Sequence, residues 1–259
     1  PIYVLEKEKW QQSSHSYRQW QFCKECLIDL NEDLSLMGQP LIIRIGDVID
    51  IFDEIKKSYE IKGIYSHQET GDFLSYKRDQ KVRRWSKENN IPWEEYIQFG
   101  VFRGPLKRDK WAKTYKKHFE KEIINITKVF KALPYKGENL PSDNFFDFEN
   151  DQCNGRSIGG RKEAIKRLNI FLKNEMYSYG KNISSPAKSH FSCSRLSPYI
   201  TMGCISLKEV LKHTKHLKTK DSKMFTSRLF WHCHFIQKLE TQPELEFKEY
   251  HPYFENIRI

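Results

Sequence analysis

The sequence has no long hydrophobic run and no ordered set of cysteines. None of its apolar stretches approaches the roughly 18 residues that a membrane-spanning helix needs, so we expect no membrane partner. A basic segment followed by an apolar one, which is typical of a signal peptide, is also missing. The six cysteines lack the spacing of a disulfide framework. We therefore expect free thiols and an intracellular location, in the cytoplasm or with the nucleoid.

Two common signatures of nucleotide and metal sites are missing as well. Neither GxGxxG nor GxxxxGK[ST] follows an apolar run, which excludes the usual glycine-rich phosphate loops. Cys23-x-x-Cys26 lacks a second pair of ligands and lies in a stretch with helical spacing, so a helix face is favoured over a metal or redox site. His232 and His234 would point to different sides of a helix, so no metal site is predicted there.

Positive charge is present in excess, but only in one part of the chain. Residues 1–150 hold 25 Lys and Arg against 24 Asp and Glu, whereas residues 151–259 hold 19 against 10. The net charge of +10 therefore comes almost entirely from the second part. A basic region beside a neutral one indicates a polyanion partner such as nucleic acid, although a solvated basic surface is the ordinary alternative.

The first part of the sequence alternates short apolar runs with amphipathic stretches. We predict helices over residues 16–38, 47–59, 74–90 and 108–123, with Asp47 capping the second and Gly38 ending the first. The predicted strands are residues 1–6, 40–46, 61–66 and 91–97. This alternation predicts βαβ units and a mostly parallel sheet, that is, a doubly wound α/β domain.

The second part has a different character. Residues 133–160 are rich in Gly, Pro, Asn and Asp and show no sustained periodicity, which indicates a linker. Helical spacing then dominates to the end, with no clear strand. We predict an α/β domain over residues 1–131, a linker over 132–159 and a mainly α-helical domain over 160–259.

The stretch "HFSCSRLSPYITMGCIS", residues 190–206, holds more polar groups than a helix start requires. Pro198 suits the first helical position and Ser197 before it is a natural N-cap. A second hydroxyl at Ser194 and the guanidinium of Arg195 would add donors beside a helix terminus that favours anions. The stretch indicates either a phosphate or diphosphate site without a glycine loop, or a capped core helix with a surface arginine.

This stretch also carries a resemblance to a known family. The sequence is similar to the start of the flavin-binding region in the DNA photolyase/cryptochrome family. The similarity lies in Tyr179, a spacer and then "CSRLSPYITMGCIS". The stretches "YSHQETGDFLSYKRD", "GGRKEAIKRLNIFL" and "LFWHCHFIQKLE" resemble further family elements and occur in the same order. The resemblance covers essentially the whole chain. It implies a photolyase-type α/β domain followed by part of an all-α FAD-binding domain.

The resemblance also implies roles for single residues. Tyr179 would lie near the phosphate and ribose of the flavin, with Tyr177 as the alternative if the spacer is counted differently. Five consecutive residues would wrap the FAD diphosphate: Cys193, Ser194, Arg195, Leu196 and Ser197. Cys193 stands where the family usually has Thr, so one hydroxyl donor is lost.

For DNA, Trp231 matches the family tryptophan that stacks on the pyrimidine lesion; a core aromatic is the alternative. His232 replaces the usual Arg, and Arg228 replaces an acidic residue, which puts the lesion contacts in doubt. Arg228 could still meet a phosphate. Glu69 falls in the region of the antenna pocket, where a second chromophore of folate or deazaflavin type would bind; an ordinary polar loop is the alternative.

The implied function is light-driven, FAD-dependent repair of DNA that contains pyrimidine dimers, by a monomer. The alternatives are a cryptochrome blue-light receptor and a DNA-binding or structural protein without flavin. The chain opens on a strand without Met, and the family's Arg-Asp-Leu-Arg strand, Gly-x-x-Gly-x-Pro-x-Val-Asp-Ala segment and tryptophan electron chain are not in it. We therefore expect a piece of a longer protein that alone binds FAD weakly or not at all.

Overall fold

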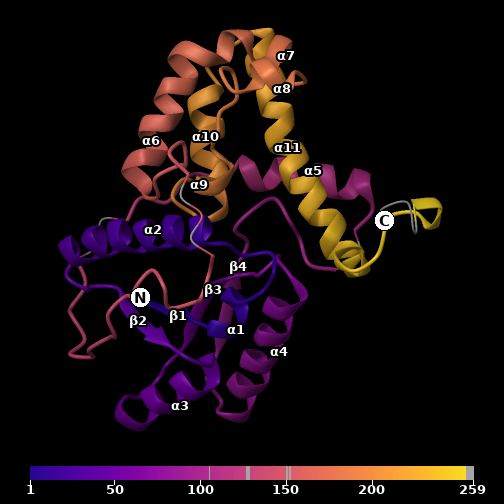
Figure 1. The fold of residues 1–259 in the computed structure, drawn as a ribbon. Coiled ribbons are helices and arrows are strands. Elements are labelled where there is room, and N and C mark those ends of the chain that lie inside the picture. The colour runs from indigo at the N-terminus through magenta and orange to yellow at the C-terminus, as the bar shows by residue number, and fades with distance from the viewer. Residues whose placement is uncertain (105, 127–128, 150, 152, 255–259) are drawn as a thin grey trace. The chain divides into compact units, whose positions relative to one another are not determined.

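A computed structural model describes the chain except for residues 105, 127–128, 150, 152 and 255–259, and Figure 1 labels its elements. By internal contacts the described chain forms two compact units. Unit 1 comprises Pro1–Ile51 and Ile123–Thr226, and unit 2 comprises Phe52–Glu122 and Ser227–Ile259.

The four predicted strands are confirmed, and they pair in parallel. In unit 1, β1 (Ile2–Leu5) pairs with β2 (Ile42–Ile45), so that Leu5 lies opposite Ile45. In unit 2, β3 (Ile64–His67) pairs with β4 (Trp93–Tyr96). Parallel neighbours require a crossover, and each pair has helical residues between its two strands. The α/β class predicted for this part is therefore confirmed.

The helices of the first part follow their local signals. They are α1 (Lys7–Trp10), α2 (Tyr17–Leu36), α3 (Val48–Ser58), α4 (Phe73–Glu88) and α5 (Arg108–Phe119). Asp47 accepts a hydrogen bond from the backbone N–H of Ile49 at 2.8 Å, which confirms the predicted cap of α3. Gly38 follows α2 with a φ of +95°, a left-handed conformation that glycine adopts without a steric penalty.

From residue 161 onward the chain is mainly helical, as predicted. It contains α6 (Arg161–Ile170), α7 (Tyr179–Asn182), α8 (Pro186–Ser189), α9 (Ser197–Thr201), α10 (Leu207–Thr214) and α11 (Lys220–Thr241). Short η segments cover Phe171–Glu175, Met176–Ser178, Pro243–Glu246 and Pro252–Phe254. Among the described residues, no helix is both long enough and apolar enough to cross a membrane.

Each compact unit combines segments from the first and second parts of the chain. In unit 1, α2 from the first part of the chain packs against α6 from the second part (Figure 1). The division into residues 1–131, 132–159 and 160–259 is not tested by this packing and stays a prediction. Positions 150 and 152 of the predicted linker lie outside the described residues.

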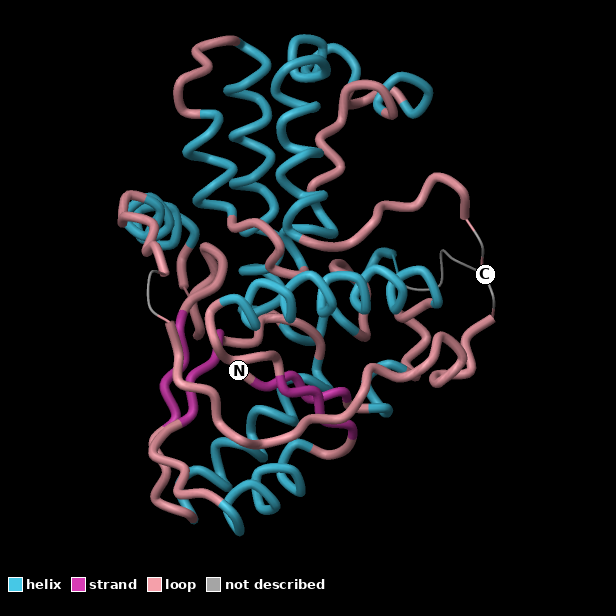
Figure 2. Tube along the Cα trace, turned by 90° about the vertical axis from the view of Figure 1, so that its left-hand side faces the viewer, coloured by secondary structure: helices cyan, strands magenta, loops and turns pink. Residues whose placement is uncertain are grey.

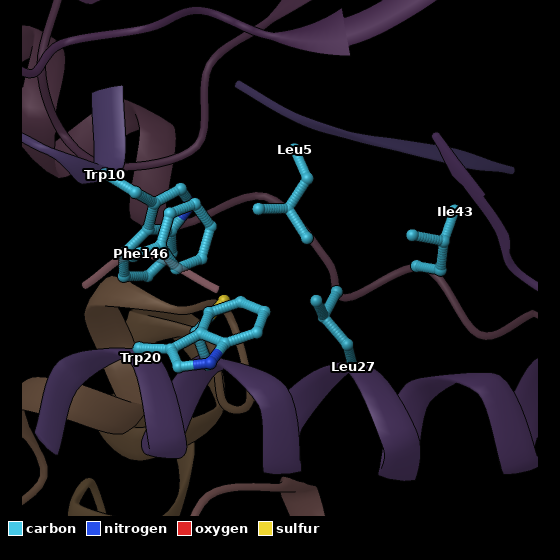
Figure 3. Packing of buried hydrophobic residues seen from close by; sticks show 7 residues of the cluster. Leu5, Trp10, Trp20, Leu27, Ile43 and Phe146 are labelled. Carbon is cyan, nitrogen blue, oxygen red and sulfur yellow. The ribbon is translucent and has the colours of Figure 1, made fainter. Parts of the chain in front are cut away.

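An aromatic cluster forms the core beside β1 and β2 (Figure 3). Trp20 of α2 is fully buried, and its ring lies 5.3 Å from that of Trp10 and 4.9 Å from that of Phe146. Further members are Leu5, Cys23, Leu27 and Ile43. Phe146 comes from the predicted linker, where no hydrophobic periodicity marks it as a core residue. A loop therefore completes this core.

The segment between α5 and α6 is neither helix nor strand over its described residues and is drawn as a loop in Figure 2. It is nevertheless fixed to unit 1. The N–H of Glu138 donates to the carbonyl of Ile43 at 2.8 Å, and the carboxylate of Glu138 accepts from the N–H of Ile45. This contact fixes the segment along β2.

The end of the same segment is tied to α2 by one carboxylate. Glu25 accepts two hydrogen bonds from the guanidinium of Arg156, at 2.6 and 2.9 Å, and one from the N–H of Gly159 at 2.7 Å. Burial alone would raise the pKa of Glu25, but these donors outweigh it and hold the pKa below the usual 4.5.

Replacing Glu25 with glutamine is expected to destabilise the fold by about 1.5–3 kcal/mol at neutral pH, because a charged acceptor is lost. A carboxyl whose pKa is lower in the folded state stabilises above its ordinary pKa and loses that contribution as the pH falls through the folded value. The difference between wild type and Glu25→Gln should therefore shrink below pH 4.5. Urea titrations across this range measure it, with Glu88→Gln at an exposed carboxylate as the control. A difference independent of pH would contradict the assignment.

Candidate functional site

The helix before the predicted flavin loop changes its winding. Residues 161–179 have helical spacing in the sequence, but α6 passes into a π-helical turn at Phe171–Glu175 and a 3-10 turn at Met176–Ser178. Phe171 and Met176 are both at most 2% exposed and lie five residues apart. A π turn places residues with this spacing on one face, whereas an α-helix does not. Burial of both side chains explains the change.

Tyr179 and the loop that follows α8 are brought together in unit 1. The ring of Tyr179 is buried, 5.8 Å from that of Phe171 and 5.5 Å from that of Phe225. The hydroxyl of Ser192 lies 3.0 Å from that of Ser178 and accepts from the amide of Asn182 at 2.8 Å. The turn that carries Tyr179 therefore lies beside residue 192. Tyr177 is 65% exposed, so the two tyrosines have different environments.

Arg167 of α6 holds the backbone of the predicted flavin loop. Its Nε donates to the carbonyl of Ser194 at 2.9 Å, and its Nη2 donates to the carbonyl of Cys193 at 3.4 Å and pairs with Glu175. Burial, and then the positive charge of Arg195, lower the pKa of Arg167. Two guanidinium groups therefore lie close enough to repel one another beside this loop.

The five predicted diphosphate-binding residues differ in exposure. Arg195 has a φ of +52°, which is uncommon for a residue other than glycine, and its exposed side chain donates to the carbonyl of His190 at 2.5 Å. Leu196 is buried, Cys193 and Ser194 are half-buried, and Ser197 is exposed. The turn at Arg195 points its side chain outward and that of Leu196 into the core.

The expected cap of the following helix is wrong. Ser197 is the first residue of α9, Pro198 the second, and Leu196 occupies the N-cap position without a side-chain hydrogen bond. Ser194 instead accepts from the N–H of Leu196 at 3.4 Å. The turn at Arg195 starts the helix one residue earlier than the proline alone indicates, so the hydroxyl of Ser197 does not cap it.

Replacing Arg167 with methionine is expected to loosen this loop without unfolding the protein. The change removes the donor to both carbonyls and leaves the half-buried Glu175 without this partner. Amide hydrogen exchange over residues 193–197 should speed up roughly tenfold. Lys166→Met is the matched control, since Lys166 is exposed on the same helix and its ion pair is with Glu163, away from the loop. Equal exchange in the two variants would show that Arg167 does not hold the loop.

The predicted DNA-binding residues of α11 fall on two faces. Trp231 is 39% exposed and Phe235 is 58% exposed, and their ring centroids lie 5.5 Å apart. Arg228, one turn before Trp231, is also exposed. His232 is half-buried, 5.5 Å from the ring of Phe99, and burial lowers its pKa. Trp231 is therefore an exposed aromatic with a basic neighbour, whereas His232 lies apart from it. Phe235 was missed, although its four-residue spacing from Trp231 is the signal that could have found it.

Glu69 lines a cavity of about 390 Å³ in unit 2. It lies in the loop that follows β3, accepts from the N–H groups of Thr70 and Gly71, and pairs with Arg78 at 3.4 Å. Other lining residues include Phe73, Tyr76, Arg103, Leu239, Glu240 and Glu246. The volume lies within the range of small-molecule sites. The residues from 239 onward were not predicted, because only folding places the end of α11 beside this loop.

Charges of both signs meet at this cavity. The guanidinium of Arg103 lies 3.0 Å from the carboxylate of Glu95 and 3.5 Å from that of Asp79. Burial raises the pKa of Glu240, although Arg103 opposes it. The exposed rings of Phe73 and Tyr76 supply apolar surface at the same place. Such a cavity suits a planar, partly polar molecule. Over the described residues, no group of three His, Cys, Asp or Glu could hold a metal ion.

Comparison with known proteins gives consistent results. Residues 1–102 match the family model described as DNA photolyase. Cryptochrome DASH of Idiomarina loihiensis is 21% identical over 229 residues, which cover 83% of this chain and 50% of that protein. The chain thus spans about half the length of the curated relatives it matches.

Solved structures show the same fold. A bacterial class III photolyase from Agrobacterium tumefaciens superimposes with a TM-score of 0.76 at 18% identity, over 100% of this chain and 56% of that one. An archaeal photolyase from Sulfolobus tokodaii, described with two FAD molecules, superimposes with a TM-score of 0.70 at 18% identity, over 100% of this chain and 57% of that one. Residues 1–102 therefore match the DNA photolyase family, and the chain as a whole is similar to cryptochromes in sequence and has the fold of photolyases and cryptochromes.

Proposed function

We propose that the protein carrying this chain repairs pyrimidine dimers in DNA with the help of FAD and light. The observation that carries the proposal is the exposed aromatic surface of α11, where Trp231 lies between Arg228 and Phe235. A flat ring stacks on an unpaired base of any sequence, and a neighbouring arginine neutralises backbone phosphate. The excess positive charge of residues 151–259 supports a nucleic-acid partner.

Members of this family typically bind FAD, and the loop from Cys193 to Ser197 fits its diphosphate. Arg167 occupies the carbonyls of Cys193 and Ser194, whereas the N–H groups of Ser194 and Arg195 donate to no other described residue. Two guanidinium groups beside these amides favour an anion. The left-handed turn at Arg195 is the kind of strained conformation that often accompanies a binding site.

In this proposal Ser194, Arg195 and Ser197 bind the diphosphate, and Arg167 positions their backbone. Tyr179 packs the adjoining turn, and its aromatic neighbours exclude water from that side. The chemistry that reduced FAD would supply when held there is light-driven transfer of an electron to a cyclobutane dimer. Trp231 would hold the flipped lesion in a defined orientation, and Arg228 would bind the adjacent backbone.

A second chromophore would bind beside Glu69. The cavity there combines aromatic rings with the charge of Arg103, which suits a planar heterocycle of folate or deazaflavin type. The structure from Sulfolobus tokodaii is described as implying a novel light-harvesting cofactor, which supports an antenna in this fold.

A cryptochrome-type light receptor is the second candidate. His232 stands where the family usually has arginine, and it packs against Phe99 away from the exposed face of Trp231. This position of His232 would weaken binding of a lesion, which favours signalling over repair.

Irradiation of the protein with a defined substrate separates the candidates. The complete reading frame that contains this chain is expressed, and an oligonucleotide with one thymine dimer is exposed to blue light in its presence. Chromatography of the digested DNA should show restored thymine only in the light. Flavin photoreduction without repair would support the cryptochrome alternative. Lesion binding by a protein without flavin would support neither.

A further inference from the structure

Two cysteines far apart in the sequence meet in unit 1. The Sγ atoms of Cys26 on α2 and Cys204 after α9 lie 3.3 Å apart, although the residues are separated by 178 positions. All six cysteines are free thiols in this structure. Cys26 is half-buried and Cys204 is 9% exposed, so a small oxidant can approach the pair.

The packing around both residues keeps the thiols together. One turn before Cys26, the ring of Phe22 contacts that of Tyr199 on α9 at 5.2 Å. The N–H of Cys204 donates to the carbonyl of Tyr199 at 2.8 Å. A Cβ added at Gly159 would lie 2.3 Å from the carbonyl oxygen of Phe22 and 2.8 Å from the Sγ of Cys26, so only glycine fits there. The pair is thus one contact of a fixed interface between α2 and α9.

The two thiols are not equivalent. The hydrogen bond from the thiol of Cys26 lowers the pKa of Cys204 to about 7. The same hydrogen bond, with burial, raises the pKa of Cys26. Burial raises the pKa of the third thiol nearby, Cys23, to about 11. Cys204 therefore forms a thiolate more readily than Cys26, which keeps its proton, and this division favours attack by one sulfur and resolution by the other.

We propose that Cys26 and Cys204 are a redox modification site that closes to a reversible disulfide on reaction with a hydroperoxide. The thiolate of Cys204 attacks the peroxide, the O–O bond breaks, and an alcohol or water leaves after taking up a proton. The sulfenic acid formed on Cys204 is then attacked by the sulfur of Cys26, whose proton leaves with the displaced hydroxide as water. Two electrons pass from the sulfurs to the peroxide. This site is independent of the flavin and DNA proposals.

The closure requires little movement and ties distant parts of the chain. The sulfurs must approach by about 1.3 Å, from 3.3 Å to the length of a disulfide bond. The bond would join α2 to the end of α9 and close a loop of 178 residues. The thermal midpoint of the oxidised protein should rise by about 5–15 °C above that of the reduced one.

Peptide mapping tests the assignment directly on the wild-type chain. The protein is treated with a small excess of hydrogen peroxide, alkylated, digested without reductant and analysed by mass spectrometry. The expected product is a linked pair of peptides that contain Cys26 and Cys204, which dithiothreitol reverses. Cys153→Ser should form the same product, since Cys153 has no part in the pair. Cys26→Ser keeps a hydroxyl donor beside Cys204 but cannot form the disulfide, so it should leave a trappable sulfenic acid on Cys204. Far-UV circular dichroism shows whether this variant is folded.

Several results would overturn the proposal. One is a peroxide-treated wild type in which both cysteines are still alkylated. Another is a disulfide between Cys23 and Cys26 in place of the expected one. An equal thermal midpoint for the oxidised and reduced proteins would refute the cross-link between α2 and α9.

Discussion

Replacing Trp231 with alanine is expected to weaken binding of dimer-containing DNA by about tenfold or more. The loss of one base–aromatic stack costs about 1–3 kcal/mol, which corresponds to roughly 5- to 150-fold in affinity. Trp231 is 39% exposed, and its ring contacts those of His234 and Phe235 on the same helix, so the change should leave the fold intact. Fluorescence anisotropy with a labelled oligonucleotide that bears one thymine dimer measures the effect.

The matched variants separate stacking from general surface changes. Trp231→Phe keeps a ring and should recover most of the affinity, whereas Tyr65→Ala removes another exposed aromatic of unit 2 and should change little. Arg228→Gln should weaken the binding of damaged and undamaged DNA to the same extent, because a phosphate contact does not distinguish a lesion from normal DNA. It should also reduce the salt dependence of that binding. If Trp231→Ala bound the lesion like wild type, α11 would not be the lesion-binding surface.

Replacing Trp20 with alanine is expected to destabilise the protein by about 3–5 kcal/mol. Trp20 is fully buried between Trp10 and Phe146, so the change opens a cavity that neighbouring rings cannot fill. Urea denaturation followed by circular dichroism gives the free energy of unfolding. Leu36→Ala, at a side chain that is 85% exposed, is the control and should stay within about 0.5 kcal/mol.

Replacing Trp20 with phenylalanine is expected to cost much less than the alanine change. Among the described residues, the indole N–H of Trp20 has no hydrogen-bond partner, so its removal relieves an unsatisfied buried donor. That gain offsets part of the lost ring volume. A Phe variant as unstable as the Ala variant would show that the volume of the ring, and not its polar atom, determines the cost.

Secondary structure was predictable here because its signals are local. The four strands lie in short runs rich in β-branched or aromatic residues, and all four are found where they were predicted. The cap by Asp47 and the left-handed Gly38 depend on one or two neighbouring residues. Such features need no knowledge of the rest of the fold.

The candidate site was predictable only as a list of residues. The motif around Ser194 and Tyr179 indicated a flavin loop through its resemblance to a family, and Trp231 was found in the same way. The support by Arg167 was not foreseen, because a guanidinium in a basic helix has the same sequence signature whether it faces solvent or a loop 27 residues away. The incorrect cap at Ser197 has a similar cause, since the turn at Arg195 depends on the burial of Leu196.

The sequence by itself determined the order of strands and helices, the excess of positive charge in the second part and the motif that resembles photolyases and cryptochromes. Each of these depends on residues within a few positions of one another, or on composition alone. Only the tertiary structure decided that Phe146 of a linker completes the core, that His232 lies off the face of Trp231, and that Cys26 meets Cys204. These contacts join residues that are distant in the chain, and close packing of the whole fold, not local propensity, selects them.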